Sequence, residues 1–251
     1  MSFVVPVFQE RRRIGRCLDA MGAFLPTLPF SHETLFVDDG STDGTSEIVE
    51  TAGLPSGRAI RYPTNRGKGH AVKVGMLAAR GRYRLFLDVD LSTPLDQLAR
   101  FLGPMERGEH VMIGTRKTAG AIVRRRQHPL RRKMGESFTI LADLMLGLRV
   151  SDITCGFKCF SAEAAEAVFS RQRIDGWAFD AESLFLARKL GYRIEEIPVV
   201  WTNDAETRVR LVRDTLGSLA ELVRIRAYAL RGRYADAVAT GPGGDPSLPQ
   251  R

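Results

Sequence analysis

The first half of the chain alternates short apolar runs, which are typical of buried strands, with longer segments of helical character. The runs expected to form strands are Phe3–Phe8, Glu33–Val37, Ala59–Tyr62, Tyr83–Leu87 and Val111–Gly114. The intervening segments 12–25, 70–79 and 94–107 are expected to be helices, as is a segment that begins within 42–45 and ends near 51. Two strands joined through a helix pair in parallel, because the helix carries the chain back to the starting edge of the sheet. The pattern therefore predicts an α/β fold with a mostly parallel central sheet flanked by helices.

Basic residues gather where this alternation ends, close to Pro129. They are Arg116, Lys117, Arg124, Arg125, Arg126, Arg131, Arg132 and Lys133. Beyond them we expect helices at 134–148, 162–169 and 177–190, a strand at 194–201, and an amphipathic helix at 212–234. The Gly/Pro/Ser-rich end of the chain is expected to be disordered. We thus expect one domain over residues 1–211, an amphipathic C-terminal helix over 212–234 and a disordered tail over 235–251.

The bulk composition limits the kind of protein and the kind of partner. With 44% hydrophobic and 26% charged residues the chain is expected to be globular, and its formal charge of +8 favours nucleic acid, anionic lipid or a phosphorylated substrate. Three cysteines without a CxxC pair argue against a disulfide framework and favour a reducing, cytoplasmic compartment. No apolar stretch reaches the ~18 residues that a transmembrane helix needs, and the chain begins directly in a strand-like run, so any membrane contact is expected to be peripheral.

The sequence Asp88-Val89-Asp90 closes the apolar run Leu85-Phe86-Leu87. Carboxylates this close repel each other unless a cation lies between them. The simplest such cation is Mg²⁺ or Mn²⁺, because it binds carboxylate oxygens and keeps positions open for phosphate oxygens. In an open α/β sheet, ligands bind at the carboxyl ends of the strands, where this pair falls. The alternative is an ordinary solvated turn, since aspartate favours turns.

Three further loops carry polar residues at expected strand ends. Gln9-Glu10 follow the first strand, where an acidic residue also suits a helix N-terminus. The loop 38–45 either hydrogen-bonds a base or ribose through Asp38 and Asp39, or caps the next helix through Ser41, Thr42, Asp43 or Thr45. Asn65-Arg66-Gly67-Lys68-Gly69 lacks the spacing of a P-loop NTPase, yet its basic side chains and glycines suit a diphosphate. Cys155 and Cys159 lack a second pair at zinc spacing, so packing is their expected role.

Taken together and in this order, these segments resemble the inverting glycosyltransferases of family 2, which have the GT-A (nucleotide-diphospho-sugar transferase) fold. The motifs that carry the resemblance are Pro6-Val7-Phe8-Gln9-Glu10, Val37-Asp38-Asp39-Gly40-Ser41 with Asp43-Gly44-Thr45, Asn65-Arg66-Gly67-Lys68-Gly69 and Asp88-Val89-Asp90. A finer resemblance, to the dolichyl-phosphate β-glucosyltransferase branch, rests on Asp88–Pro94, Asp152–Phe160 and Trp177–Glu182. That branch transfers glucose from UDP-glucose to a polyprenyl or dolichyl phosphate, with inversion.

The resemblance also implies roles for individual residues. Those that match the site of the nucleotide-sugar donor are Pro6, Phe8, Glu10, Val37, Asp39, Lys68, Asp88, Val89 and Arg208. The metal, Mg²⁺ or Mn²⁺, is expected on Asp88, Asp90 and Ser92, and the expected catalytic residues are Asp90, Arg116 and Asp180. Arg131 and Arg132 match an arginine that binds the acceptor phosphate. Relatives usually carry a lysine at the position of Arg208 and a tyrosine or alanine at that of Phe8.

Three other functions fit parts of the sequence. A mannosyltransferase that uses GDP-mannose would share the nucleotide pocket, but Cys155–Lys158 and Trp177–Asp180 favour glucose. A nucleic-acid-binding protein would suit the charge alone, and the sequence carries no readable motif for it, so nucleic acid is not an expected partner. A non-catalytic module that binds sugar nucleotides would not need both Asp88 and Asp90.

A lipid acceptor would explain the basic and amphipathic segments. Lys and Arg near anionic headgroups contribute about 1 kcal/mol each to membrane binding, and an amphipathic helix adds apolar burial. The alternative is that the helices at 134–148 and 212–234 pack against the core and their arginines are solvated. On the first interpretation, we expect a cytoplasmic hexosyltransferase that binds peripherally to the anionic inner face of a membrane.

Overall fold

The computed structural model describes residues 1–125, 129–203 and 211–234 of the chain. Its strands are β1 (Ser2–Val7), β2 (Glu33–Asp38), β3 (Gly57–Arg61), β4 (Tyr83–Leu87), β5 (Val111–Thr115), β6 (Ile122–Arg125), β7 (Phe157–Ser161), β8 (Ile194–Pro198) and β9 (Val200–Thr202). Its α-helices are α1 (Ile14–Phe24), α2 (Thr45–Thr51), α3 (Lys68–Ala78), α4 (Ala99–Glu106), α5 (Pro129–Leu146), α6 (Ala162–Phe169), α7 (Phe179–Lys189) and α8 (Leu211–Leu230). Short 3-10 turns cover Leu25–Thr27 and Leu95–Leu98.

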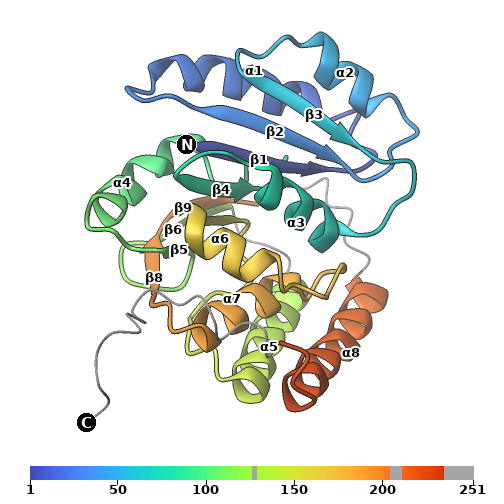
Figure 1. Cartoon of the computed structure of the whole chain (residues 1–251), viewed down its shortest axis with the longest axis vertical. Helices are drawn as coiled ribbons and strands as arrows, with labels where there is room; N and C mark the ends of the chain where they lie inside the picture. The colour runs from blue at the N-terminus through green and yellow to red at the C-terminus, as the bar shows by residue number, and fades with distance from the viewer. Residues whose placement is uncertain (126–128, 204–210, 235–251) are drawn as a thin grey trace, which may run out of the picture.

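The central sheet has the strand order β3-β2-β1-β4-β7-β5-β8 (Figure 1). Strands β1 to β4 pair in parallel, and β5 is parallel to β8. β7 alone in this sheet runs antiparallel, to both β4 and β5. The predicted mostly parallel sheet is therefore confirmed. β6 and β9 form a separate two-stranded ribbon, and Thr202 N donates to Ser92 O at 2.8 Å, which ties the ribbon to the loop after β4.

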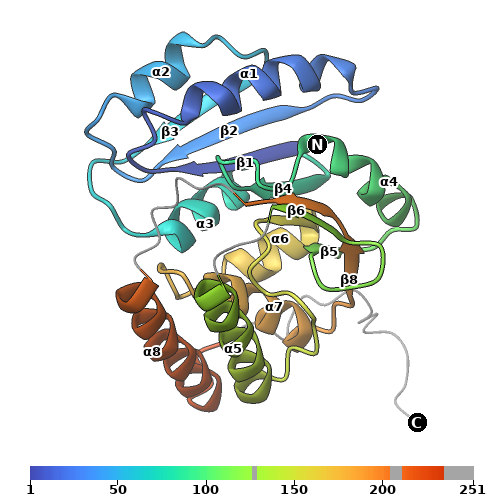
Figure 2. The ribbon, with the colours of Figure 1, turned by 180° about the vertical axis from the view of Figure 1, so that it is seen from behind.

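Helices cover both faces of the sheet and produce two apolar cores (Figures 1 and 2). α1, α2 and α4 cover one face, where Phe3, Phe36 and Phe101 are buried. α3, α6 and α7 cover the other face, where Val4 and Phe86 are buried. α5 and α8 pack against each other beyond α7, at the end of the molecule farthest from β2 and β3. The strands read as continuous apolar runs because neither face of the sheet is left to solvent.

Most expected elements form within a few residues of their predicted bounds, with four corrections. β7 (Phe157–Ser161) is a buried strand in a segment for which no strand bounds were expected. Ile122–Arg125 was not expected to be a strand; all four residues of β6 are exposed, so no apolar alternation marks it. The single strand expected at 194–201 is two strands, which belong to different sheets and divide at Val199. α5 begins at Pro129 rather than at residue 134, because proline is tolerated in a first helical turn. The tail expected at 235–251 lies outside the described residues.

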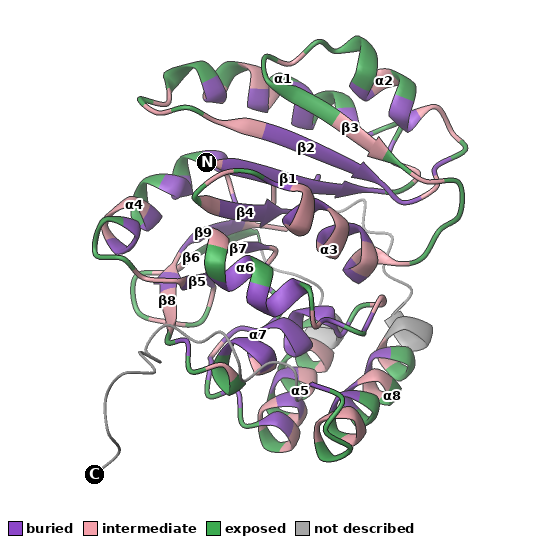
Figure 3. Ribbon diagram, viewed as in Figure 1, coloured by how far each residue is buried: buried purple, intermediate pink, exposed green. Residues whose placement is uncertain are grey.

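The helices α5 and α8 have many exposed positions (Figure 3), and several of these carry large apolar residues. They are Ile140 and Leu144 on α5 and Leu216, Val223 and Leu230 on α8. None of the helices in the described part of the chain combines the length and the hydropathy needed to cross a membrane. The expected core packing of the inner faces is also present, since Ala142, Leu146, Leu222 and Ile225 are buried. Core packing is thus confirmed for the inner faces of these helices, while their binding to a membrane stays a prediction.

Candidate active site

Polar loops converge where β1, β2 and β4 end, at one edge of the sheet. β1 pairs in parallel with both β2 and β4, so the residues that follow these strands lie side by side. Glu10 follows β1, Asp39 follows β2, and Asp88 and Asp90 follow β4. The structure thus brings together the segments that the sequence singled out.

The buried carboxylate of Asp39 holds the loop before α3. Its Oδ1 accepts from the backbone N–H of Arg66 at 2.8 Å, and its Oδ2 accepts from Gly67 N–H at 2.8 Å and from Asn65 Nδ2 at 2.7 Å. Gly67 has a φ of +114°, and a Cβ there would collide with the carbonyl of Asp175, so only glycine fits. Asp39 therefore sets the position of Lys68, the first residue of α3.

The neighbouring acids Asp38 and Asp43 form hydrogen bonds within the same loop and at the start of α2. Asp38 accepts from the Ser41 N–H at 2.9 Å and from the Ser46 hydroxyl. Asp43 accepts from the Thr45 N–H at 3.1 Å, at the start of α2. Asp38 and Asp43 thus bind within their own loop, while Asp39 binds across to the loop before α3. The expected contact of this loop with a base or ribose stays a prediction.

Glu10 is buried and forms a two-point ion pair with Arg13, at 2.8 and 2.6 Å. Its backbone N–H donates to Thr45 Oγ1 at 2.8 Å, which joins the loop after β1 to α2. Pro6 and Val37 are buried opposite each other in the β1–β2 register. The Phe8 ring, in contrast, is 38% exposed. This strand end therefore combines an exposed aromatic side chain, Phe8, with a buried ion pair, Glu10–Arg13.

Asp88 lies between a lysine and a glycine. Lys68 Nζ is 2.5 Å from Asp88 Oδ1, and it also lies 5.5 Å from the centre of the Trp177 ring. Burial disfavours the charge on Lys68, but the carboxylates of Asp88 and Asp180 outweigh burial and raise its pKa. On the other side, Gly156 O accepts from Asp88 N–H at 3.2 Å, and a Cβ at Gly156 would overlap the Asp88 carboxylate.

Asp90 has fewer hydrogen-bond and ion-pair partners among the described residues than Asp88 has. Its Oδ1 accepts from the Ser92 N–H at 2.9 Å, and burial, followed by repulsion from Asp88, raises its pKa. Within the described residues no cluster of three or more His, Cys, Asp or Glu side chains forms a metal site. Two neighbouring carboxylates that repel each other nevertheless fit a hard divalent cation, which completes its shell with phosphate and water oxygens. Val89 between them is buried.

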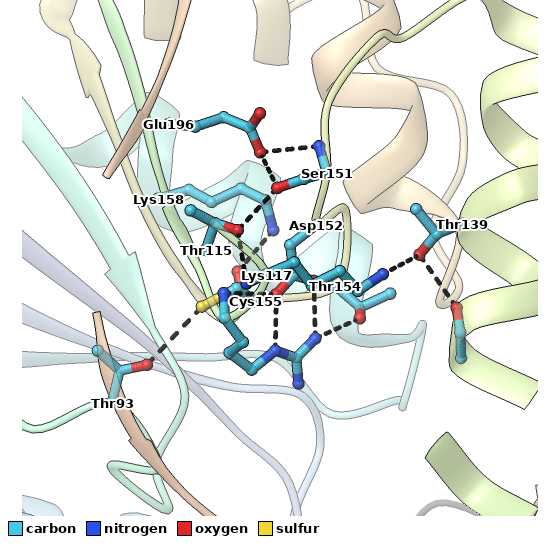
Figure 4. Close-up of polar contacts among 12 residues, drawn as sticks. Thr93, Thr115, Lys117, Thr139, Ser151, Asp152, Thr154, Cys155, Lys158 and Glu196 are labelled. Atoms are coloured by element: carbon cyan, nitrogen blue, oxygen red, sulfur yellow. Dashed lines mark hydrogen bonds and ion pairs between the residues drawn. The ribbon is translucent and has the colours of Figure 1, made fainter. Parts of the chain in front are cut away.

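At the end of β5, Arg116 is bound by a buried aspartate. Its Nε and Nη2 donate to the two oxygens of Asp152, both at 2.7 Å, and Nη2 also donates to Thr154 Oγ1 at 2.9 Å (Figure 4). The guanidinium lies 5.1 Å from the centre of the Trp201 ring. Burial disfavours both charges, yet the pairing raises the pKa of Arg116 and lowers that of Asp152. Arg116 is thus a permanent cation in a fixed orientation.

A set of hydroxyl groups ties this strand end to its neighbours (Figure 4). Ser151 Oγ donates to Glu196 Oε1 on β8 at 2.5 Å and lies 2.8 Å from Thr115 Oγ1 on β5. Lys117 Nζ donates to Thr139 Oγ1 on α5 at 3.4 Å. The end of β5 is therefore joined both to the sheet and to the outer helix α5.

Asp180, in the first turn of α7, is buried against an ammonium group. Lys158 Nζ, fully buried on β7, lies 2.5 Å from Asp180 Oδ1 and donates to Cys155 O at 2.7 Å. Burial raises the pKa of Asp180, while the charges of Lys158 and Lys68 act against the rise. Cys155 and Cys159 are buried free thiols, which confirms their expected packing role. The residue expected to be catalytic is thus paired inside the protein.

The basic residues expected to bind the acceptor lie at the start of α5. Arg132 is exposed, and its Nε is 3.5 Å from Glu136 Oε1, one helical turn later. The side chains of Arg131 and Arg208 lie outside the described residues.

Three residues at this site belong to the segment Asp152–Phe160 that carried the finer resemblance, but the sequence assigned them no role: Asp152, Gly156 and Lys158. Lys158 had a usable signal, because it interrupts the apolar strand Phe157–Ser161, and a charge in a buried strand requires a buried partner. Asp152 and Gly156 had none, since their role depends on Arg116 and Asp88, which are distant in sequence.

The fold and the acidic strand ends define a GT-A nucleotide-sugar transferase architecture, which solved structures share. Glucosyl-3-phosphoglycerate synthase of Mycobacterium tuberculosis, solved with Mn²⁺, UDP-glucose and phosphoglyceric acid, matches with a TM-score of 0.67 at 20% identity, over 90% of this chain and 79% of that one. Mannosyl-3-phosphoglycerate synthase of Rubrobacter xylanophilus matches with a TM-score of 0.59 at 19% identity, over 99% of this chain and 78% of that one. The GT-A fold expected from the sequence is confirmed.

Sequence comparisons give the family. The model described as "Glycosyl transferase family 2" matches residues 2–169, and the chain belongs to this family. A dolichyl-phosphate beta-glucosyltransferase of Dictyostelium discoideum is 33% identical over 247 residues, which cover 92% of this chain and 75% of the relative. A dolichyl-phosphate beta-glucosyltransferase of Saccharomyces cerevisiae is 31% identical over 259 residues, which cover 94% of this chain and 77% of the relative. The resemblance seen in the motifs is thereby confirmed.

Proposed function

We propose that the protein transfers glucose from UDP-glucose to a polyprenyl or dolichyl phosphate, with inversion of the anomeric centre. The observation that carries the proposal is the grouping of Asp88, Asp90 and Lys68 at the ends of parallel strands in a family 2 chain. Two further findings support it. Relatives that match most of the chain are named dolichyl-phosphate beta-glucosyltransferases, and a structure with this fold was solved with UDP-glucose and Mn²⁺.

The donor binds across the ends of β1, β2 and β4. Its base and ribose bind to the residues that the family pattern assigns to them, which are Pro6, Phe8, Glu10, Val37 and Asp39. Val89 and Arg208 are further donor-binding residues in the same pattern. Lys68 supplies positive charge for the diphosphate. Asp88 and Asp90, with Ser92, hold Mg²⁺ or Mn²⁺, which when bound stabilises the charge of the departing diphosphate.

The acceptor needs no general base. The second pKa of a phosphate monoester is ~6, so an oxygen that can attack the anomeric carbon is largely ionised at neutral pH. This agrees with the position of Asp180, whose carboxylate is bound to Lys158. Arg116, fixed by Asp152, and the arginines Arg131 and Arg132 bind and orient the acceptor phosphate. Attack from the side opposite the diphosphate inverts the anomeric configuration.

The lipid tail of the acceptor places the reaction at a membrane surface. α5 and α8 expose the apolar side chains Ile140, Leu144, Leu216, Val223 and Leu230. The same two helices carry the exposed basic residues Arg132, Lys133, Arg224 and Arg226. Apolar side chains that enter the headgroup layer and cations close to anionic lipids both stabilise binding. The protein therefore acts peripherally, at the anionic inner face of the membrane in the cytoplasm.

Transfer of label into lipid tests the proposal. Purified protein is incubated with polyprenyl phosphate, Mn²⁺ and either radiolabelled UDP-glucose or radiolabelled GDP-mannose. We expect label from UDP-glucose to enter the organic phase as a product that mild acid cleaves, and we expect no label from GDP-mannose. Label from GDP-mannose alone would replace glucose with mannose as the transferred sugar. Label from neither donor would overturn the proposed function.

A further inference from the structure

One short segment, residues 152–158, contacts both halves of the proposed active site. On one side, Asp152 and Thr154 bind the Arg116 guanidinium. On the other side, Gly156 accepts from the Asp88 N–H at 3.2 Å and lies directly against its carboxylate. The segment therefore separates the donor carboxylate from the acceptor-side arginine.

The turn at Cys155-Gly156 is held from three directions. Gly156 O accepts from Asp88 N–H, Cys155 Sγ lies 3.7 Å from the Thr93 hydroxyl, and Cys155 O accepts from Lys158 Nζ at 2.7 Å. The antiparallel register of β4 and β7 pairs Leu87 with Phe157, which brings Gly156 opposite Asp88. The loop that contains Asp88, Asp90 and Thr93 thus rests on this turn at both of its ends.

Stability alone does not account for the ammonium group that holds the turn. Lys158 is fully buried, 2.5 Å from Asp180 Oδ1 and 5.2 Å from the centre of the Phe86 ring. Taking an ammonium and a carboxylate out of water costs several kcal/mol per ion. Apolar residues of similar volume often stabilise a core as well as such a pair does, or better. What an apolar pair would lack is the hydrogen bond to Cys155 O.

We propose that Lys158 is a positioning residue of the transferase. It fixes the Cys155-Gly156 turn, and the turn fixes the Asp88 carboxylate relative to Arg116, while Asp180 holds the ammonium in place. The inference rests on the proposed function, because it assigns Asp88 to the metal and the donor. A misplacement of ~1 Å in such a site lowers the rate by ~10²-fold, which is large enough to measure.

The test separates position from stability by removing first one charge and then both. Lys158→Met leaves Asp180 buried without its partner, whereas Lys158→Met/Asp180→Leu removes both charges of the pair. Calorimetry gives the Kd of UDP with Mn²⁺ and with a chelator, and the ratio of the two values is the gain that the metal provides. We expect the double variant to regain the melting temperature that the single variant loses, while the gain from Mn²⁺ stays at least ~10-fold below that of the parent. A direct catalytic role of Asp180 would not change this binding ratio.

Lys73→Met is the matched control. Lys73 Nζ also donates to a backbone carbonyl, that of Gln172 at 2.7 Å, but on α3 and away from the Cys155-Gly156 turn. We expect Mn²⁺ to improve the UDP affinity of Lys73→Met by the same factor as that of the parent. A double variant with the ratio of the parent would overturn the positioning role, and so would a double variant that fails to fold, because the pair would then serve stability. A parent protein that binds UDP no better with Mn²⁺ would overturn the proposed function itself.

Discussion

The two sides of the proposed active site are held in different ways. On the donor side, at the ends of β1, β2 and β4, buried carboxylates such as Asp39 and Glu10 are bound by backbone N–H groups or by arginine. On the acceptor side, at the end of β5 and along α5 and α8, the fixed cation Arg116 lies beside helices whose outer side chains are exposed. A water-soluble nucleotide requires a polar site that is already formed. A lipid phosphate needs only an oriented cation and a surface on which its tail can remain in the membrane.

The largest effect is expected from the donor side. Asp90→Ala should lower transfer by at least ~10³-fold, because the metal contributes several kcal/mol to the stabilisation of the transition state. The melting temperature should stay close to that of the parent, since Asp90 lies in a loop and burial already disfavours its charge. Asp96→Ala, at an exposed acid shortly after the same loop, is the control and should transfer normally. If Asp90→Ala turned over at nearly the rate of the parent, the assignment of the metal to this loop would be wrong.

The ion pair between Asp152 and Arg116 should contribute measurably to the free energy of unfolding. Asp152→Asn leaves the Arg116 guanidinium without its buried partner and should lower the free energy of unfolding by ~3–5 kcal/mol at neutral pH. The pKa of Asp152 is lowered in the folded protein, so the pair contributes its full stability above pH ~4 and loses it as the pH falls through the folded pKa. Urea unfolding of parent and variant should therefore differ less in acid. A difference that does not change with pH would contradict the ionic origin of the effect.

The exposed helices should matter for binding to membranes and not for folding. Ile140 and Leu144 are 69% and 81% exposed. Ile140→Ser/Leu144→Ser should weaken sedimentation with anionic vesicles by at least ~10-fold, because a fully buried side chain of this kind is worth ~1.5–3 kcal/mol. Ile122→Ser, at an exposed position of β6, is the control. Binding by the parent should also weaken in high salt, since exposed charges are screened over ~8 Å at physiological ionic strength. A parent protein that stays in the supernatant at low salt would exclude the membrane surface.

The smallest expected effect concerns acceptor affinity. Arg131→Ala/Arg132→Ala should raise the KM for polyprenyl phosphate by about 10-fold and leave kcat nearly unchanged, because these residues contribute to ground-state binding. Arg193→Ala, a change at another exposed arginine, serves as the control for lost surface charge. If the double variant keeps the acceptor KM of the parent, the acceptor phosphate binds elsewhere.

Much of the fold was predictable from the sequence, because its signals are local. The apolar run 83–87 and the helix 162–169 form with the bounds expected for them, since each is bounded by polar or turn residues. β6 was not predictable, because its four exposed residues carry no pattern and its partner β9 is far away in the sequence.

The candidate site was predictable only in part, for a similar reason. The acidic strand ends were visible because several carboxylates stand close together in the sequence at Asp88-Val89-Asp90 and at Asp38-Asp39. The residues that hold them, Gly156 and Lys158, come from a later strand and the turn before it, and no local pattern connects them to Asp88. A sequence therefore indicates which groups do chemistry more readily than which groups keep them in place.

The antiparallel strand β7 has a consequence for the order in which this protein folds. β7 lies between β4 and β5, so β4 stays an open, apolar edge until the chain has been synthesised through residue 161. An unpaired edge of this kind invites association with other chains, and pairing between distant segments is slow. The loop that contains Asp88 is thus among the early parts of the chain to leave the ribosome, yet it cannot acquire its final shape until much later. A nascent chain stalled between α4 and β7 should depend on chaperones, whereas one that has released β7 should not.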